Sequence, residues 1–265
     1  MIRNIIYNQD CVEGMRELVL DQSVDLVVTS PPYNLGIKYD VFNDKMSIPD
    51  YWKWCEVWLK EIYRVLKPDG RLCLNHYLSC GRGSNGDNTE GRFGPLMNLN
   101  YIAESIGFHH HGVAIWDEIT LAKPTAWGSW LSASAPYVNS PYEGVLILFK
   151  DHWKKDRPGK TDISVKEFMG AITGVWKFQP EQDRTTPAPF PVALPRRCIL
   201  LLTWEGDLVL DPFMGSGSTA VAAKQTRRDF IGFEISKAYC DIAKKRLEQD
   251  NLLNWLPAKV AGIFD

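Results

Sequence analysis

Two short segments, far apart in the chain, carry residues whose types could do chemistry. The first is Ser30-Pro31-Pro32-Tyr33, which follows the largely apolar residues 24–28. The second spans residues 211–219, contains two closely spaced glycines and follows the largely apolar residues 207–210. Each segment therefore stands where a short buried strand is expected to end. Ligands of parallel sheets bind just beyond such strand ends, so both segments are candidates for a binding site.

The proline-rich segment suits the binding of an amino group attached to a nucleic-acid base. Two prolines fix φ and keep the preceding backbone extended, which makes a rigid platform. Ser30 Oγ and the Pro31 carbonyl could accept the two amino hydrogens and favour a pyramidal nitrogen whose lone pair faces a methyl donor. An exposed Tyr33 ring could stack on the base, a contact worth about 1–3 kcal/mol. A turn that only closes a strand is the structural alternative, and Ser30, Pro31, Pro32 and Tyr33 are the predicted catalytic residues.

The glycine-containing segment suits a nucleoside ligand. Gly215 and Gly217 allow a sharp turn and a close approach of backbone to ligand, and the helix that follows offers free N–H groups. Glu234 directly follows the next apolar run, residues 230–233. An acidic side chain at the end of that strand can accept hydrogen bonds from both hydroxyls of a ribose. The spacing is neither a dinucleotide fingerprint, since position 220 is alanine, nor a phosphate-binding loop, since no Gly-Lys pair follows.

Short strands alternate with amphipathic helices around both segments. The spacing of apolar residues predicts a helix over 51–66, a turn at 67–70 and strands at 71–75 and 145–149. A second unit follows, with predicted strands at 207–210 and 230–233, a helix at 220–228, and a helix at 237–249 with Ser236 as its N-cap. Such alternation predicts a mostly parallel sheet covered on both faces.

The two segments together resemble the motifs of the amino-methyltransferases of DNA restriction–modification systems. The resemblance rests on Ser30-Pro31-Pro32-Tyr33 and on Asp211-Pro212-Phe213-Met214-Gly215-Ser216-Gly217, and covers about residues 1–80 and 140–250. Because the catalytic motif comes before the cofactor motif, the chain is similar to the β group of that family. The resemblance implies a Rossmann-like α/β fold, a mostly parallel seven-stranded sheet with one antiparallel strand and a permuted order of motifs.

The resemblance also implies S-adenosylmethionine as cofactor and S-adenosylhomocysteine as product. Asp10, in Asn8-Gln9-Asp10-Cys11, matches the family's acidic motif near the cofactor adenine. Phe190, in residues 186–191, matches the segment that passes the methionine end. The predicted cofactor-binding residues are therefore Asp10, Phe190, Asp211, Phe213, Gly215, Ser216, Gly217 and Glu234.

The resemblance makes double-stranded DNA the expected substrate, and base flipping follows because a paired amino group is buried in the duplex. Family members with serine at position 30 are often cytosine-N4 enzymes, whereas Tyr33-Asn34 also occurs among adenine-N6 enzymes. We expect cytosine N4, with adenine N6 as the alternative. A methyltransferase of RNA or of a protein amide and a non-catalytic DNA-binding protein of the same fold remain the other interpretations.

The middle of the chain differs from its ends. We interpret residues 1–265 as one catalytic domain with an inserted target-recognition region at roughly 79–142 and a basic segment at 150–185. Five basic residues in these regions are candidates for phosphate contacts, although solvated surface charge is an equal alternative: Arg82, Arg92, Lys154, Lys155 and Arg157.

The composition bears on three further points: the surface charge, a membrane span and a metal site. A net charge of −2 excludes a uniformly basic coat but not a local basic surface, and no apolar run is long enough to span a membrane. We therefore expect a cytoplasmic protein with no membrane partner. The six cysteines show no metal-ligand spacing, and three adjacent histidines at 109–111 would not converge on one ion, so no metal is expected. A cognate restriction endonuclease and a homodimer are partners that the family allows.

Overall fold

A computed structural model describes residues 1–78, 94–117, 129–136, 142–182 and 185–255 of the chain. The described strands form one eight-stranded sheet in the order β1-β8-β7-β2-β3-β5-β4-β6. These strands are β1 (Ile5–Asn8), β2 (Val24–Thr29), β3 (Leu66–Tyr77), β4 (His109–Asp117), β5 (Glu143–Phe149), β6 (Val175–Lys177), β7 (Leu208–Asp211) and β8 (Asp229–Glu234).

Only β5 runs against the other strands of this described sheet. It pairs antiparallel with β3 on one side and β4 on the other, while all other neighbouring strands pair in parallel. The expectation of a mostly parallel sheet with a single antiparallel strand is confirmed. Consequently, the beginning of β5 lies at the same edge as the carboxyl ends of β2, β3, β7 and β8.

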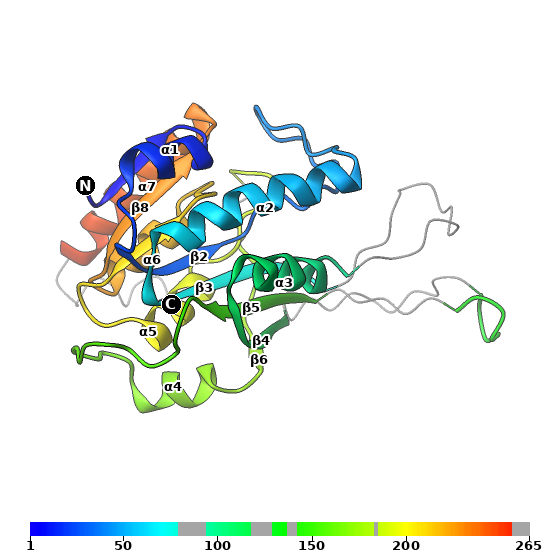
Figure 1. Cartoon of the computed structure of the whole chain (residues 1–265). Helices are drawn as coiled ribbons and strands as arrows, with labels where there is room; N and C mark the ends of the chain where they lie inside the picture. Colours follow the sequence, from blue (N-terminus) through cyan, green and yellow to red (C-terminus); the bar gives the residue numbers. More distant parts are fainter. Residues whose placement is uncertain (79–93, 118–128, 137–141, 183–184, 256–265) are drawn as a thin grey trace.

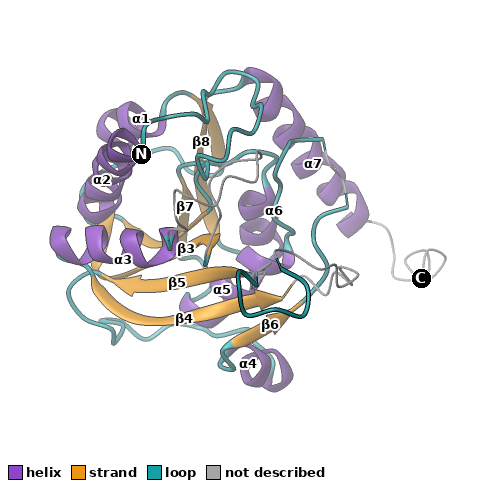
Figure 2. Cartoon of the chain, turned by 90° about the vertical axis from the view of Figure 1, so that its right-hand side faces the viewer, coloured by secondary structure: helices purple, strands orange, loops and turns teal. Residues whose placement is uncertain are grey.

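Helices cover the two faces of the sheet, which gives three layers (Figure 1, Figure 2). One face carries α1 (Cys11–Leu18), α2 (Ile48–Val65) and α3 (Pro95–Ile106), whose apolar residues share one core cluster. The other face carries α5 (Ala193–Leu202), α6 (Ser218–Gln225) and α7 (Lys237–Trp255), which contribute to a second cluster. The short α4 (Val165–Ala171) lies beside α5 near the β6 edge.

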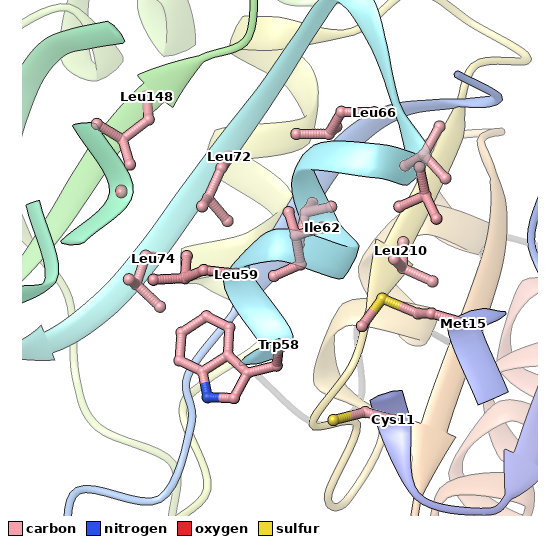
Figure 3. Packing of buried hydrophobic residues seen from close by; sticks show 14 of the residues in the cluster. Cys11, Met15, Trp58, Leu59, Ile62, Leu66, Leu72, Leu74, Leu148 and Leu210 are labelled. Carbon is pink, nitrogen blue, oxygen red and sulfur yellow. The ribbon is translucent and has the colours of Figure 1, made fainter. Parts of the chain in front are cut away.

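The helix α2 shows how the sequence builds this core. Ser47 caps its first turn by accepting a hydrogen bond from the Asp50 N–H at 3.3 Å, and Pro49 stands in that turn. The apolar side chains recur at helical spacing, so that one face is buried; Figure 3 shows Trp58, Leu59 and Ile62 packed against the sheet. The helix thus begins three residues before the predicted start at residue 51.

Two sequence expectations need correction. The described sheet has eight strands rather than seven. The additional strand is β6, whose residues 175–177 follow α4 and pair with β4 on the side away from β5. The expected insertion at 79–142 also contains parts of the core. Residues 95–106 form α3, whose Leu96 and Leu99 are buried under the sheet, and residues 109–117 form β4. These two elements were not predicted from the sequence, because histidines and aromatic residues interrupt the regular spacing of apolar residues in this stretch.

The first part of the basic segment packs along the amino-terminal edge of the sheet. Lys150 Nζ donates to the Leu66 carbonyl at 2.9 Å, and the Asp156 N–H donates to Asp69 at 2.9 Å. Further along the segment, Arg228 Nη1 donates to both carboxylate oxygens of Asp162, each at 2.7 Å. The Arg228 side chain is fully buried, so this pair fixes the segment against the start of β8.

Within the described residues, no helix combines the length and the apolar character that crossing a membrane would require.

We predict that Asp162→Ala lowers the free energy of unfolding by about 3 kcal/mol, because it leaves a buried guanidinium without its partner. Urea unfolding followed by circular dichroism would measure this loss. Arg227→Gln is the matched control, since Arg227 also reaches Asp162, at 3.4 Å, but its side chain is 62% exposed. An equal shift of the unfolding midpoint in both variants would contradict a special role for the buried pair.

Candidate active site

A pocket opens at the carboxyl-terminal edge of the sheet, beyond β1, β2, β7 and β8. It brings together residues from six separated stretches of the chain. Its walls are lined by Asp10, Cys11, Ser30, Pro32, Tyr39, Val41, Phe42, Trp54, Thr186, Ala188, Pro189, Phe190, Pro212, Phe213, Met214, Gly215, Ser216, Ser218, Phe233, Glu234, Ile235, Ser236 and Tyr239. The two motifs identified in the sequence therefore meet at one place.

The carboxylate of Asp211 joins these two motifs below the pocket. Thr29, the residue before Ser30, donates its hydroxyl to Asp211 Oδ1 at 2.7 Å. Thr219, in the first turn of α6, donates to Oδ2 at 2.6 Å, and the Phe213 N–H donates to Oδ1 at 3.0 Å. Burial raises the pKa of Asp211 to about 6, while these three donors favour its charged form. Asp211 is fully buried and does not line the pocket, so it supports the glycine turn from beneath.

The glycine turn has the strained geometry that its sequence suggests. Gly215 and Gly217 have φ of +52° and +88°, in the left-handed region where a side chain is disfavoured. A Cβ on Gly217 would also lie 2.8 Å from Ala243 Cβ in α7. Gly217 does not line the pocket; it turns the chain into α6 so that the helix N-terminus faces the cavity.

Glu234 stands at the end of β8 and faces the pocket beside this turn. Its two carboxylate oxygens accept the N–H groups of Gly215 at 2.9 Å and of Ser236 at 2.8 Å. Burial raises the pKa of Glu234 above its usual value, and the two backbone donors lower it. Each oxygen keeps a lone pair. The pair of oxygens is therefore arranged to accept two neighbouring hydroxyl groups.

Asp10 and Phe190 reach the same pocket from opposite sides. Asp10 caps α1, with Oδ1 accepting the N–H groups of Val12 at 2.8 Å and Glu13 at 3.2 Å. Phe190 belongs to the segment before α5, and its carbonyl accepts the Ser218 hydroxyl at 2.8 Å. Sequence alone could not place these residues in space, yet both line the cavity as expected.

One wall of the pocket was missed in the sequence. It is formed by the loop after Tyr33, in which Asp44 accepts the N–H groups of Asn34, Leu35 and Ile37 at 2.7–3.0 Å. The wall contributes aromatic rings, with Phe42 and Trp54 5.4 Å apart between centroids. It is closed against the start of α7 by the Ser236 hydroxyl, which donates to Asp40 at 2.6 Å. No motif marks these positions, because only the folded loop brings them to the cavity.

Arg246 of α7 is a second residue that sequence reasoning missed. Its Nη1 donates to Ser216 Oγ at 2.8 Å and to Ser218 Oγ at 3.3 Å, so it binds both hydroxyls of the glycine turn. Its other nitrogen pairs with Glu181 at 3.1 Å. Arg246 does not itself line the pocket and is paired with Glu181; it holds the two hydroxyls beside the N-terminus of α6, which suits an anionic group of a ligand.

The predicted catalytic loop, residues 30–33, is more enclosed than expected. Tyr33 is only 9% exposed, and its ring stacks on His76 with the centroids 3.9 Å apart. The Tyr33 hydroxyl contacts Ser30 Oγ at 2.8 Å and donates to Glu143 at 2.9 Å. Ser30 and Pro32 line the pocket, whereas Pro31 is buried. The expectation of an exposed Tyr33 ring is wrong, because β3 and β5 extend beyond β2 and cover it.

The predicted phosphate-binding residues do not gather at this pocket. Lys154, Lys155 and Arg157 lie in the segment along the opposite, amino-terminal edge of the sheet. Lys155 is largely buried there, with its Nζ 3.6 Å from Asp25 and 3.5 Å from Asp207. These three residues are therefore not retained as DNA contacts. Arg82 and Arg92 lie outside the described residues.

Comparison with known proteins identifies the family. A family model for DNA methylases, covering N6- and N4-methyltransferases, matches residues 24–245. The type II methyltransferase M.MjaVI of Methanocaldococcus jannaschii is 41% identical over 165 residues, which is 62% of this chain and 81% of that protein. The type II methyltransferase M.HpaI of Haemophilus parainfluenzae is 30% identical over 249 residues, covering 87% and 70% of the two chains.

A solved structure agrees with these relatives. The putative DNA modification methylase TTHA0409 from Thermus thermophilus, solved in complex with S-adenosyl-L-methionine, has a TM-score of 0.72 and 25% identity. The match covers 92% of this chain and 93% of that one. Since both the family model and the relatives span most of the chain, this protein belongs to the DNA amino-methyltransferases of the restriction–modification type, enzymes whose methyl donor is S-adenosylmethionine.

Proposed function

We propose that this protein methylates the N4 amino group of a cytosine that has been flipped out of double-stranded DNA. The observation that carries the proposal is that Ser30 and Glu234, from motifs far apart in the sequence, line one pocket at the sheet edge. A ribose at Glu234 and an amino group at Ser30 would then be held on the two sides of a transferable methyl group.

The residues present fit S-adenosylmethionine at each of its parts. Glu234 suits the ribose hydroxyls, Asp10 the adenine side, and the turn at Ser216 with Arg246 the carboxylate. When bound, the cofactor supplies a methyl group on a sulfonium and leaves as S-adenosylhomocysteine. In the transfer, the amino nitrogen of the base would bond to the methyl carbon as the carbon–sulfur bond breaks with its electron pair left on sulfur, and the amino group would lose one proton to water. The protein contributes by positioning and electrostatics, without a covalent intermediate.

The choice of cytosine rests on serine at position 30. Within the resembled family, Ser-Pro-Pro-Tyr is more frequent among cytosine-N4 enzymes, whereas Asp or Asn at that place is more frequent among adenine-N6 enzymes. The adenine alternative is kept because either base presents an amino group that Ser30 Oγ could bind. Direct identification of the methylated nucleoside decides between the two.

DNA is proposed to approach the carboxyl-terminal edge of the sheet. The chain leaves this edge after Tyr77 at the end of β3 and after Asp117 at the end of β4, and returns to it at Glu143. Because Tyr77, Asp117 and Glu143 all lie at this edge, we propose the stretches 79–93 and 118–142 as the target-recognition region of a single catalytic domain. Within the second stretch, Trp130 and Leu131 are exposed, as suits apolar side chains that contact bases. Arg82 and Arg92 stay proposed phosphate contacts.

The relatives named type II methyltransferases support a role in a restriction–modification system, for which we propose a cognate endonuclease as the functional partner and the cytoplasm as the site of action. A homodimer stays a further proposal.

The central test is transfer of labelled methyl groups from S-adenosylmethionine to unmethylated plasmid DNA, followed by nucleoside analysis. We expect N4-methylcytosine at defined sites. N6-methyladenine would replace the cytosine proposal by its alternative. Cofactor binding without any transfer, on several DNAs of different sequence, would instead favour the non-catalytic DNA-binding protein.

We predict that Glu234→Ala weakens the binding of both S-adenosylhomocysteine and 5′-methylthioadenosine by about tenfold or more, because both ligands carry the ribose hydroxyls. Isothermal titration calorimetry measures both dissociation constants. Glu248→Ala, an exposed glutamate of α7, is the matched control. Unchanged constants in Glu234→Ala would show that the ribose lies elsewhere.

Arg246→Met is predicted to act on only one of these two ligands. It should weaken S-adenosylhomocysteine by about tenfold and leave 5′-methylthioadenosine nearly unchanged, because the latter lacks the amino-acid carboxylate. Glu181→Gln removes the same ion pair but keeps the guanidinium, and should bind both ligands at least as well as the wild type. Equal weakening of both ligands by Arg246→Met would mean that Arg246 only supports the turn.

A further inference from the structure

A chain of hydrogen bonds runs from the antiparallel strand β5 to the serine of the catalytic loop. It begins at Glu143, the first residue of β5, whose Oε2 accepts the Tyr33 hydroxyl at 2.9 Å. The amide nitrogen of Asn75, near the end of β3, donates to Tyr33 Oη at 3.0 Å and also to the Glu143 carboxylate. Tyr33 Oη lies 2.8 Å from Ser30 Oγ, which ends the chain at the pocket.

The number of available protons determines which group donates and which accepts in each hydrogen bond of this chain. A carboxylate can only accept, and a phenol has a single proton. Since the Tyr33 proton is directed to Glu143, the Tyr33 oxygen must accept at its remaining sites. Asn75 fills one of them, and the Ser30 hydroxyl fills the other. Ser30 therefore donates to Tyr33, and its own lone pairs are left for the pocket.

The surroundings keep this direction from being reversed. Glu143 is 8% exposed and Asn75 only 1%, so water has little access to the inner bonds. Burial and the neighbouring Glu143 raise the pKa of Tyr33 well above its usual value, which keeps the phenol protonated. The stacking of Tyr33 on His76 holds the ring itself in place.

The direction matters for the reaction. A serine that accepts an N–H from the amino group leaves the nitrogen lone pair free to attack the methyl carbon. A serine that donated its proton to the nitrogen would instead occupy that lone pair. The rotation of one hydroxyl group thus separates a reactive arrangement from an unreactive one.

We propose that Glu143 and Asn75 are positioning residues for methyl transfer: acting through the Tyr33 hydroxyl, they turn the Ser30 proton away from the pocket and make Ser30 an obligatory acceptor for the target amino group. This inference rests on the proposed methylation of a base amino group. It assigns the Tyr33 hydroxyl a role separate from that of its ring, and it gives β5 a part in the site that no sequence motif marks.

The test compares single-turnover methyl transfer at saturating cofactor and DNA. Tyr33→Phe keeps the ring and removes the hydroxyl, and Glu143→Gln presents an amide N–H that can reverse the chain. Each should slow transfer by about tenfold or more, as the loss of a preorganised catalytic hydrogen bond does. The dissociation constant for S-adenosylhomocysteine should stay at the wild-type value, which also shows that the variant is folded. Glu104→Gln, an exposed glutamate of α3, is the matched control and should leave the rate unchanged.

Double variants separate positioning from a general structural role. Because both residues act through the same Ser30 hydroxyl, Tyr33→Phe combined with Glu143→Gln should be no slower than either alone. In a Ser30→Ala background, Tyr33→Phe should have no further effect; this comparison decides the matter even if Glu143→Gln does not fold. Wild-type rates in Tyr33→Phe, or losses that multiply in the double variants, would overturn the inference. A wild-type protein that transfers no methyl group would instead refute the proposed function itself.

Discussion

The buried carboxylate of Asp211 is the interaction on which the site depends. It accepts hydrogen bonds from Thr29 next to Ser30, from Thr219 in the first turn of α6, and from the Phe213 N–H in the segment that leads to the glycine turn. A carboxylate without access to water needs such donors, because an unpaired buried charge is strongly unfavourable. The distance between the segment that begins at Ser30 and the glycine turn is therefore set within the protein core.

The walls of the pocket are held differently from its floor. The floor consists of strand ends and the first turn of α6, whose backbone groups are fixed by the sheet. The walls are two loops tied to α7 or its start by few polar contacts, one from Asp40 to Ser236 and the other from Glu181 to Arg246. These contacts join side chains of loops to side chains of α7 or its start, whereas the floor is held by the backbone hydrogen bonds of the sheet.

The single antiparallel strand in the described sheet has a consequence for chemistry as well as for topology. Because β5 runs against its neighbours, its first residue lies where the other strands end, and Glu143 meets Asn75 and Tyr33 there. A residue at the start of a strand would be far from the site in a wholly parallel sheet. The same reversal brings the end of β4, at Asp117, and the start of β5, at Glu143, to one edge of the sheet.

The sequence by itself determined the fold class and the two motifs that meet at the pocket, because strand ends, prolines and glycines act through local backbone geometry. Ser30, Gly215 and Glu234 could be named from their neighbours alone. Tertiary structure decided which way side chains face and what lies beside them. In the folded protein, Tyr33 is buried and Lys155 lies at the opposite edge of the sheet. Arg246 and Glu143 reach the site through hydrogen bonds between residues that are 28 to 110 positions apart in the sequence. Such contacts depend on the packing of distant elements, which no local pattern of residues records.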